Sequence, residues 1–194
     1  MKKFLCLLLV AISVWALSSS QTFAYNSLSM CYPANMNYST NGNIDSLTIS
    51  VKPQVLYAEV GLYMVFSPEK AYWFDYSWFK SNDSLEVAMY FDMPENAMFI
   101  DSWLWFEGYI IKAKHYDRWT GSKIYEDIVH RTRRDPSIVY KNSATEYEVR
   151  VFPIQGSGTR KIKLTYLVPF YMTSSSARIN LPFHLASLSK KATH

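Results

Sequence analysis

Residues 146–166 read EYEVRVFPIQGSGTRKIKLTY and contain two stretches of alternating apolar and polar residues. Every second residue is apolar in residues 147–151 (YEVRV), and residues 161–166 (KIKLTY) repeat the pattern. A period of two is typical of strands that bury one face. Pro153 is expected to end the first strand, and the glycines of residues 156–158 permit a reversal. The stretch therefore predicts a half-buried antiparallel hairpin.

The first 24 residues have the composition of a secretory signal peptide. Lys2 and Lys3 precede an apolar run over residues 4–17, and residues 22–24 (TFA) form a cleavage site. The run is shorter than the roughly 20 residues that a stable membrane span needs. An uncleaved anchor stays open, but no later stretch is apolar enough to span. We expect an exported chain (secreted, periplasmic or cell surface) that starts at Tyr25 and has no transmembrane span after signal cleavage.

The mature chain is expected to carry little net charge and a single cysteine. Without Lys2 and Lys3 the 20 Lys and Arg residues become 18, against 16 Asp and Glu, so the formal charge falls from +4 to +2. This balance argues against nucleic acid as a partner. Cys6 lies in the leader, so Cys31 has no partner for an intramolecular disulfide. Met30 stands where a lipoprotein site wants a small residue, which makes Cys31 a free or buried thiol.

The rest of the chain is rich in short strand patterns. Residues 25–43 are polar and predict an irregular lead-in, and residues 187–194 predict a frayed tail. Between them, residues 44–186 contain repeated alternating stretches broken by Pro, Asn and Gly, as a single β domain would. Many short strands with one helix predict a mainly β fold, an antiparallel β-sandwich.

One helix is predicted, over about residues 121–131. Ile124 and Ile128 lie four residues apart, as an amphipathic helix requires. Thr120 can cap its start. Pro136 disfavours helical backbone at the residue before it, so the helix should end near Arg131.

Several segments together resemble the VIT domain, the vault and inter-alpha-trypsin inhibitor module. The matching segments, in chain order, are residues 89–97 (MYFDMPENA), 124–128 (IYEDI), 135–139 (DPSIV), 147–154 (YEVRVFPI) and 158–166 (GTRKIKLTY). The resemblance extends over roughly residues 46–170. It implies the β-rich VIT fold and a partner-docking role.

Two departures from the family pattern bear on this resemblance. The family usually carries Ala four residues before the helix Tyr, where this chain has Gly121. Glycine costs about 1 kcal/mol of helix propensity, so we expect the helix to start later than in relatives. Many relatives continue into a von Willebrand A domain with an Asp-x-Ser-x-Ser metal motif. Here residues 75–79 (DYSWF) lack the second Ser, so the resemblance implies no metal-dependent adhesion site.

Two groups of residues are candidates for a partner surface. Arg131, Arg133 and Arg134 form the densest basic cluster. Their place at a helix C-terminal end, where cations favour the macrodipole, already accounts for them structurally. An acidic partner or anionic lipid is the functional alternative.

The second group is aromatic. Two runs, residues 72–79 and 103–106, concentrate the Trp and Tyr residues, and one face of each run must meet something other than the core. The candidates for a protein contact or a sugar-stacking platform are Trp73, Trp78, Trp103 and Trp105.

The sequence contains no recognisable catalytic or metal-binding motif. His115 and Asp117 could share one face of a strand, but two ligands do not make a zinc site, and His130 is not at ligand spacing. The chain has no Gly-x-Ser-x-Gly nucleophile elbow. We therefore expect no catalytic residues, no metal and no cofactor.

The sequence thus predicts an exported, non-enzymatic VIT-like protein that acts by protein interaction. It would be the N-terminal module of a larger assembly or a truncated relative of longer VIT plus von Willebrand A proteins. The alternative from another class is a carbohydrate-binding β-sandwich that uses exposed aromatic residues. A hydrolase whose site has no recognisable motif is a third alternative.

Overall fold

The computed structural model describes residues 26–33, 35–69, 80, 82–132 and 136–189, with the side chains of residues 131 and 132 excepted. The described part is mainly β. Its elements are β1 (Ser27–Tyr32), β2 (Asn35–Pro53), β3 (Tyr57–Pro68), β4 (Ser84–Asp92), β5 (Met98–Phe106), β6 (Tyr109–Lys112), α2 (Arg118–Asp127), the π-helical turn η2 (Ile128–Thr132), β7 (Ser137–Lys141), β8 (Glu146–Gln155), β9 (Arg160–Pro169), β10 (Tyr171–Met172), β11 (Ala177–Arg178) and the 3₁₀ helix η3 (Phe183–Leu188).

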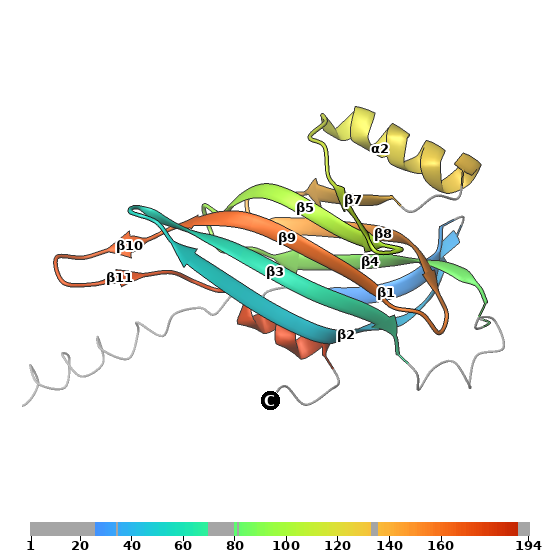
Figure 1. The fold of residues 1–194 in the computed structure, drawn as a ribbon, viewed down its shortest axis with the longest axis horizontal. Helices are drawn as coiled ribbons and strands as arrows, with labels where there is room; N and C mark the ends of the chain where they lie inside the picture. The colour runs from blue at the N-terminus through green and yellow to red at the C-terminus, as the bar shows by residue number, and fades with distance from the viewer. Residues whose placement is uncertain (1–25, 34, 70–79, 81, 133–135, 190–194) are drawn as a thin grey trace, which may run out of the picture.

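In the described part of the chain, nine strands form one antiparallel sheet in the order β6-β5-β9-β3-β2-β1-β4-β8-β7. The sheet curls at β2, whose first part pairs with β1 and whose second part, from Gly42 onward, pairs with β3. We call β1, β4, β8 and β7 the first half, and β3, β9, β5 and β6 the second half. In Figure 1 the second half lies in front, the first half behind, and α2 at the top. The predicted mainly β, antiparallel fold is confirmed.

The core fills the space between the two halves. Alternate residues of the strands on both sides belong to one continuous apolar cluster, which η3 closes with Leu185. Its fully buried members include Val87, Met89, Val149 and Val151 from the first half and Leu62, Met64, Ile162 and Leu164 from the second. The strand faces predicted from alternation for residues 147–151 and 161–166 are therefore correct.

The predicted hairpin over residues 146–166 is wrong. β8 pairs with β4 and β7, whereas β9 pairs with β3 and β5, so the two strands belong to opposite halves. The turn after Gln155, closed by the Gly158 N–H bonding the Gln155 carbonyl at 2.8 Å, carries the chain across the core. Alternation specifies which face of a strand is buried, but it does not specify which strand lies beside it.

Pro153 does not end β8, as the sequence predicted. The strand continues to Gln155, and the pairing of β8 with β4 shifts between Leu85 and Val87, opposite Phe152 and Pro153. A bulge removes the need for a ladder hydrogen bond, so proline is accommodated there.

The lead-in predicted to be irregular over residues 25–43 is largely strand. β1 and the first part of β2 occupy residues 27–32 and 35–43, and β1 lies between β2 and β4 in the sheet. Leu28 and Met30 are buried, and Ser29 between them pairs with Ala88 of β4, whose carbonyl also accepts a hydrogen bond from the Ser29 hydroxyl at 3.4 Å. Polar residues of low strand propensity are thus held in a strand by pairing with a neighbouring strand on each side. Local strand propensity does not predict this effect of tertiary context.

The helix starts earlier than predicted. α2 begins at Arg118, and its N-cap is Asp117, whose carboxylate accepts a hydrogen bond from the Thr120 N–H at 3.0 Å. Gly121 does not delay it, because a capped first turn tolerates the weak helix propensity of one glycine. The expected start at residue 121 and the expected cap at Thr120 are therefore corrected.

The C-terminal region contains little strand. Among its described residues, Ala177–Arg178 pairs with β10, and the chain then forms η3, which includes Ser187 and Leu188. The remainder of the predicted frayed tail, residues 190–194, lies outside the described residues. The helices in the described part of the chain are too short or too polar to cross a bilayer.

Candidate functional site

The predicted surface residues divide into those that the structure places and those that it does not. Trp73, Trp78, Arg133 and Arg134 lie outside the described residues, and only the backbone of Arg131 is described, within η2. Trp103 and Trp105 are both placed, on β5.

Trp103 and Trp105 lie on the outer face of the second half of the sheet. Ser102 and Leu104, the residues that alternate with them, are buried at 2% and 0% exposure, so the two indoles point away from the core. The neighbouring strand β9 presents lysines on the same face, with Trp103 opposite Lys163 and Trp105 opposite Lys161.

Four strands contribute to this surface. Tyr63 on β3 is opposite Lys163, and Lys112 on β6 is opposite Trp103. Aromatic and cationic side chains therefore alternate across the sheet, from strand to strand. We call this surface the cationic–aromatic face, formed by Tyr63, Trp103, Trp105, Lys112, Lys161 and Lys163.

The lysines of the cationic–aromatic face lie over its aromatic rings. The Lys163 Nζ is 4.4 Å from the Trp103 ring centroid and 5.2 Å from that of Tyr63. The Lys161 Nζ is 4.5 Å from the Trp105 centroid, and the Lys112 Nζ is 5.0 Å from that of Trp103. The negative faces of the rings hold the ammonium groups in place.

The ammonium groups of the face are not occupied by ion pairs within the described residues, where none of the three lysines pairs with a carboxylate. The nearby Asp101 is engaged by its neighbours, since it accepts hydrogen bonds from the Trp103 indole and the Ser102 N–H. The face therefore presents positive charge on an aromatic base, an arrangement suited to binding carboxylates.

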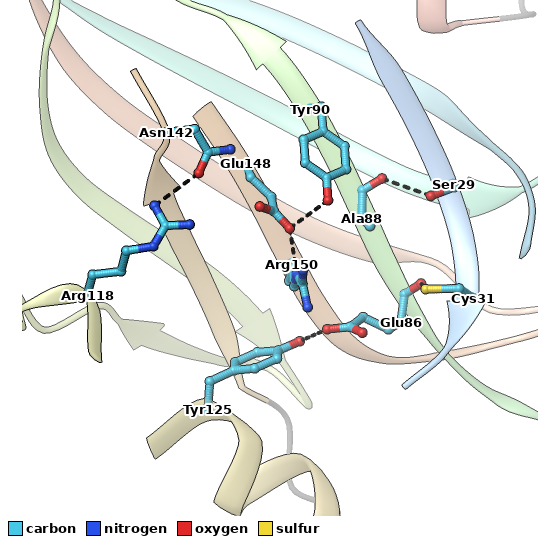
Figure 2. A network of polar contacts seen from close by, with 10 residues as sticks. All are labelled: Ser29, Cys31, Glu86, Ala88, Tyr90, Arg118, Tyr125, Asn142, Glu148 and Arg150. Carbon is cyan, nitrogen blue, oxygen red and sulfur yellow. Dashed lines mark hydrogen bonds and ion pairs between the residues drawn. The ribbon is translucent and has the colours of Figure 1, made fainter. Parts of the chain in front are cut away.

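A second polar cluster lies beneath α2 (Figure 2). Tyr125 of the helix donates to Glu86 Oε1 at 2.5 Å, and Glu86 is 2% exposed. On the adjacent strand, Glu148 accepts from Arg150 Nε at 2.6 Å and from the Tyr90 hydroxyl at 2.9 Å. The contact between Tyr125 and Glu86 fixes the helix to the outer face of the first half, where Tyr125 also packs against Phe152 and Val129.

Burial shifts the ionisation of this cluster. It raises the pKa of Glu86, against the opposing effects of the Tyr125 hydrogen bond and the Arg150 charge. Burial and the Glu86 charge together raise the pKa of Tyr125. Burial also raises the pKa of the Cys31 thiol to about 12, which keeps the thiol protonated at neutral pH. The thiol is free and buried, as predicted.

The residues considered as a metal pair have structural roles. The His115 Nε2 lies 2.9 Å from the Ile100 carbonyl, and Asp117 caps α2. The hydrogen bonds with Thr120 lower the pKa of Asp117. Among the described residues, no group of three or more His, Cys, Asp or Glu side chains is placed to hold a metal ion.

Residues 77–166 match the family model of the vault protein inter-alpha-trypsin domain. This segment is similar to the VIT domain. It contains β4–β8 and most of β9, whereas β1–β3 precede the match and complete the same sheet. A VIT domain suggests a protein-interaction module of the inter-alpha-trypsin family. The comparison with curated proteins gives no significant match to the chain.

The sequence identified the tryptophans of the VIT-domain surface but missed their cationic neighbours. The predicted hairpin gives the strand of Lys161 and Lys163 the wrong neighbour, so it does not predict their contacts with Trp105 and Trp103. The alternation of residues 160–166 does place both lysines outward. Only the pairing of β9 with β5 brings them onto Trp103 and Trp105.

Proposed function

We propose that this chain is an exported, non-catalytic VIT-domain protein that binds an acidic surface of a partner protein through its cationic–aromatic face. The observation that carries the proposal is the placement of Lys161 and Lys163 directly over Trp105 and Trp103, without a carboxylate partner within the described residues. Tryptophan and tyrosine are enriched among residues that dominate binding energy at protein interfaces. Charge complementarity adds specificity and increases the association rate.

Export is proposed from the leader alone. Lys2 and Lys3 followed by the apolar residues 4–17 form a signal sequence, with cleavage before Tyr25. The VIT domain would then act outside the cytoplasm, as a free module or as the N-terminal part of a longer VIT plus von Willebrand A protein.

The non-catalytic role is supported by how the buried ionisable groups are used. Glu86 accepts a hydrogen bond from Tyr125 of α2 and so holds the helix, and Glu148 accepts from Arg150 within the sheet, so both carboxylates are used in structural contacts. The Cys31 thiol stays protonated and is buried, so it is a poor nucleophile.

Carbohydrate binding is the second candidate, favoured by the adjacent indoles of Trp103 and Trp105, whose centroids are 6.0 Å apart. Lysine ammonium groups lie over both rings, however. A neutral sugar would have to displace them in order to stack. The geometry therefore supports an acidic partner more strongly.

The test measures binding of poly-L-glutamate by calorimetry at low salt. The double variant K161Q/K163Q should raise the Kd at least about tenfold. The control K123Q/K141Q removes the same net charge from α2 and β7, and should change the Kd by less than about threefold. Equal weakening by both variants would show that only net charge matters and would overturn the proposal.

A parallel titration addresses the carbohydrate candidate. Polygalacturonate presents carboxylates on sugar rings, whereas poly-L-glutamate presents them on a polypeptide. Protein binding predicts that poly-L-glutamate binds more tightly. Tighter binding of polygalacturonate that is lost in Trp103→Ala and Trp105→Ala would mean that the partner is an acidic polysaccharide and not a protein.

A further inference from the structure

Strand β6 forms one free edge of the nine-stranded sheet. Among the described residues β6 pairs with β5 alone, and all four of its residues are exposed. Tyr109, Ile110 and Ile111 are 75%, 45% and 45% exposed, an unusual concentration of apolar side chains at an edge. Natural proteins usually protect such edges, because an unpaired strand is a template for another strand.

The hairpin geometry identifies the backbone groups that face outward. Glu107 and Gly108 form a two-residue turn with φ of 46° and 84°, and the Ala113 N–H bonds the Ser102 carbonyl at 2.8 Å. In an antiparallel ladder, hydrogen-bonded and non-hydrogen-bonded pairs alternate. Because residue 113 bonds to β5, the N–H and C=O groups of Ile110 and Lys112 point to the free edge.

A cleft of about 340 Å³ lies beside this edge, between β6, α2 and β7. Ile111 lines it from β6, Ile124 from α2 and Ile138 from β7. Ser102 also lines the cleft; it is 2% exposed, and its Oγ has no hydrogen-bond partner among the described residues. The cleft therefore offers apolar contacts and one unused hydroxyl to an entering side chain.

We propose that the free edge of β6 takes up an extended strand of the partner protein, in which acidic and apolar side chains alternate. The strand bonds to the outward backbone groups of Ile110 and Lys112. Its apolar side chains enter the cleft, and its acidic side chains meet Lys112 on the cationic–aromatic face. This inference rests on the proposed function, because it specifies how the acidic partner is held.

Charge selects this occupant over a second copy of the chain. Lys112 lies on β6, Lys114 follows it and lines the cleft, and Lys161 and Lys163 are on the same sheet face as Lys112. Pairing two β6 edges would bring these lysines together, and like charges on adjacent strands are destabilising. In a strand with acidic residues at alternate positions, by contrast, every acidic side chain points to the face that carries the lysines, because side chains alternate between the two faces of a strand.

The experiment compares two peptides of identical composition, one with alternating Glu and Val and one with all Glu residues before all Val residues. The alternating peptide should bind at least about tenfold more tightly by calorimetry. In amide hydrogen exchange of the unsubstituted protein, it should slow exchange at Ile110 and Lys112 at least about tenfold. Equal affinity for the two peptides, or unchanged exchange at both amides, would overturn the strand-addition proposal.

A pair of variants at one position tests the backbone contact directly. Ile110→Pro removes the outward N–H, which β5 does not use, while Ile110→Ala keeps it and removes the side chain. Ile110→Pro should weaken the alternating peptide about tenfold, and Ile110→Ala by less than about threefold. The exchange measurement on the unsubstituted protein keeps the proposal testable if Ile110→Pro does not fold.

Failure of this inference can be told apart from failure of the proposed function. If poly-L-glutamate binds in a manner sensitive to K161Q/K163Q but the two peptides bind equally, strand addition is wrong and the cationic–aromatic face remains an acidic-partner site. If poly-L-glutamate binding does not respond to K161Q/K163Q, the proposed function is wrong, and the inference is overturned with it.

Discussion

The contact between Tyr125 and Glu86 joins the helix to the sheet at the level of single residues. Both side chains are almost fully buried. The Glu86 carboxyl group has therefore lost its hydrogen bonds to water, and it is stabilised instead by the Tyr125 hydroxyl and by nearby charge. A buried acceptor that loses its donor bears its full desolvation cost. The stability of the helix–sheet contact should therefore depend on this hydroxyl.

Tyr125→Phe should lower the free energy of unfolding by about 1–3 kcal/mol, because it removes the donor and leaves Glu86 buried. Urea denaturation measures the change. Tyr116→Phe is a matched control, since Tyr116 is 53% exposed and should change stability by less than about 0.5 kcal/mol. Similar losses in the two variants would show that the Tyr125 hydroxyl makes no special contribution.

Glu86→Gln should become more favourable, relative to the unsubstituted protein, as the pH rises. A free Glu has a pKa of about 4.3, and burial raises the pKa of Glu86 in the folded chain. The folded state then binds more protons than the unfolded state, so stability falls as the pH rises from about 4.3 through the raised value. Glutamine does not titrate but can still accept from Tyr125.

The measurement is the free energy of unfolding of both proteins at a series of pH values from 4 to 8. Subtracting one curve from the other removes the titration of all other groups. The difference should increase in favour of Glu86→Gln toward high pH. A difference that stays constant or decreases would mean that the folded-state pKa of Glu86 is not raised.

At the scale of elements, two glycines have opposite surroundings. A Cβ at Gly121 in α2 would meet Ile138 Cδ1 at 3.6 Å and Tyr116 Cβ at 3.7 Å, ordinary contacts. A Cβ at Gly42 in β2 would come within 2.7 Å of the buried Leu28 Cγ. The first position tolerates a methyl group, whereas the second lets β2 pass close to β1 where the sheet curls.

Gly121→Ala should raise the free energy of unfolding by about 0.5–1 kcal/mol through better helix propensity. Gly42→Ala should lower it by about 1–3 kcal/mol through overpacking. Thermal and urea unfolding of the two variants test both signs. Destabilisation by Gly121→Ala would mean that α2 requires a glycine for a reason other than space.

Element faces could be predicted from the sequence, but element neighbours could not. The alternation in residues 147–151 and 161–166 assigned the core-facing residues of these stretches correctly, although Glu148 and Thr165 on the opposite face are also buried. The short glycine turn predicted a hairpin. A turn between paired strands and a turn that crosses from one half of the sheet to the other use similar residues, so the turn sequence does not distinguish them. Long-range packing, which is absent from local pattern, decides between them.

At the scale of the whole molecule, the order of the strands in the second half of the sheet assembles the cationic–aromatic face. Its residues come from position 63, positions 103–112 and positions 161–163, which become adjacent only in the order β6-β5-β9-β3. The VIT resemblance and the mainly β class were available from the sequence, as were Trp103 and Trp105. The position of the lysines over these tryptophans depends on the order of the strands in the sheet, and no local sequence pattern encodes that order.

The most direct test of the cationic–aromatic face follows the indole N–H signals of the protein by NMR while poly-L-glutamate is added. Trp103→Phe and Trp105→Phe assign the two signals, and Trp119, 84% exposed on α2, serves as the internal reference. We expect the Trp103 and Trp105 signals to shift with saturation as poly-L-glutamate is added, and the Trp119 signal to change little. In K161Q/K163Q the shift of the Trp103 and Trp105 signals should be abolished. Shifts at Trp119 with unchanged Trp103 and Trp105 signals would contradict this expectation.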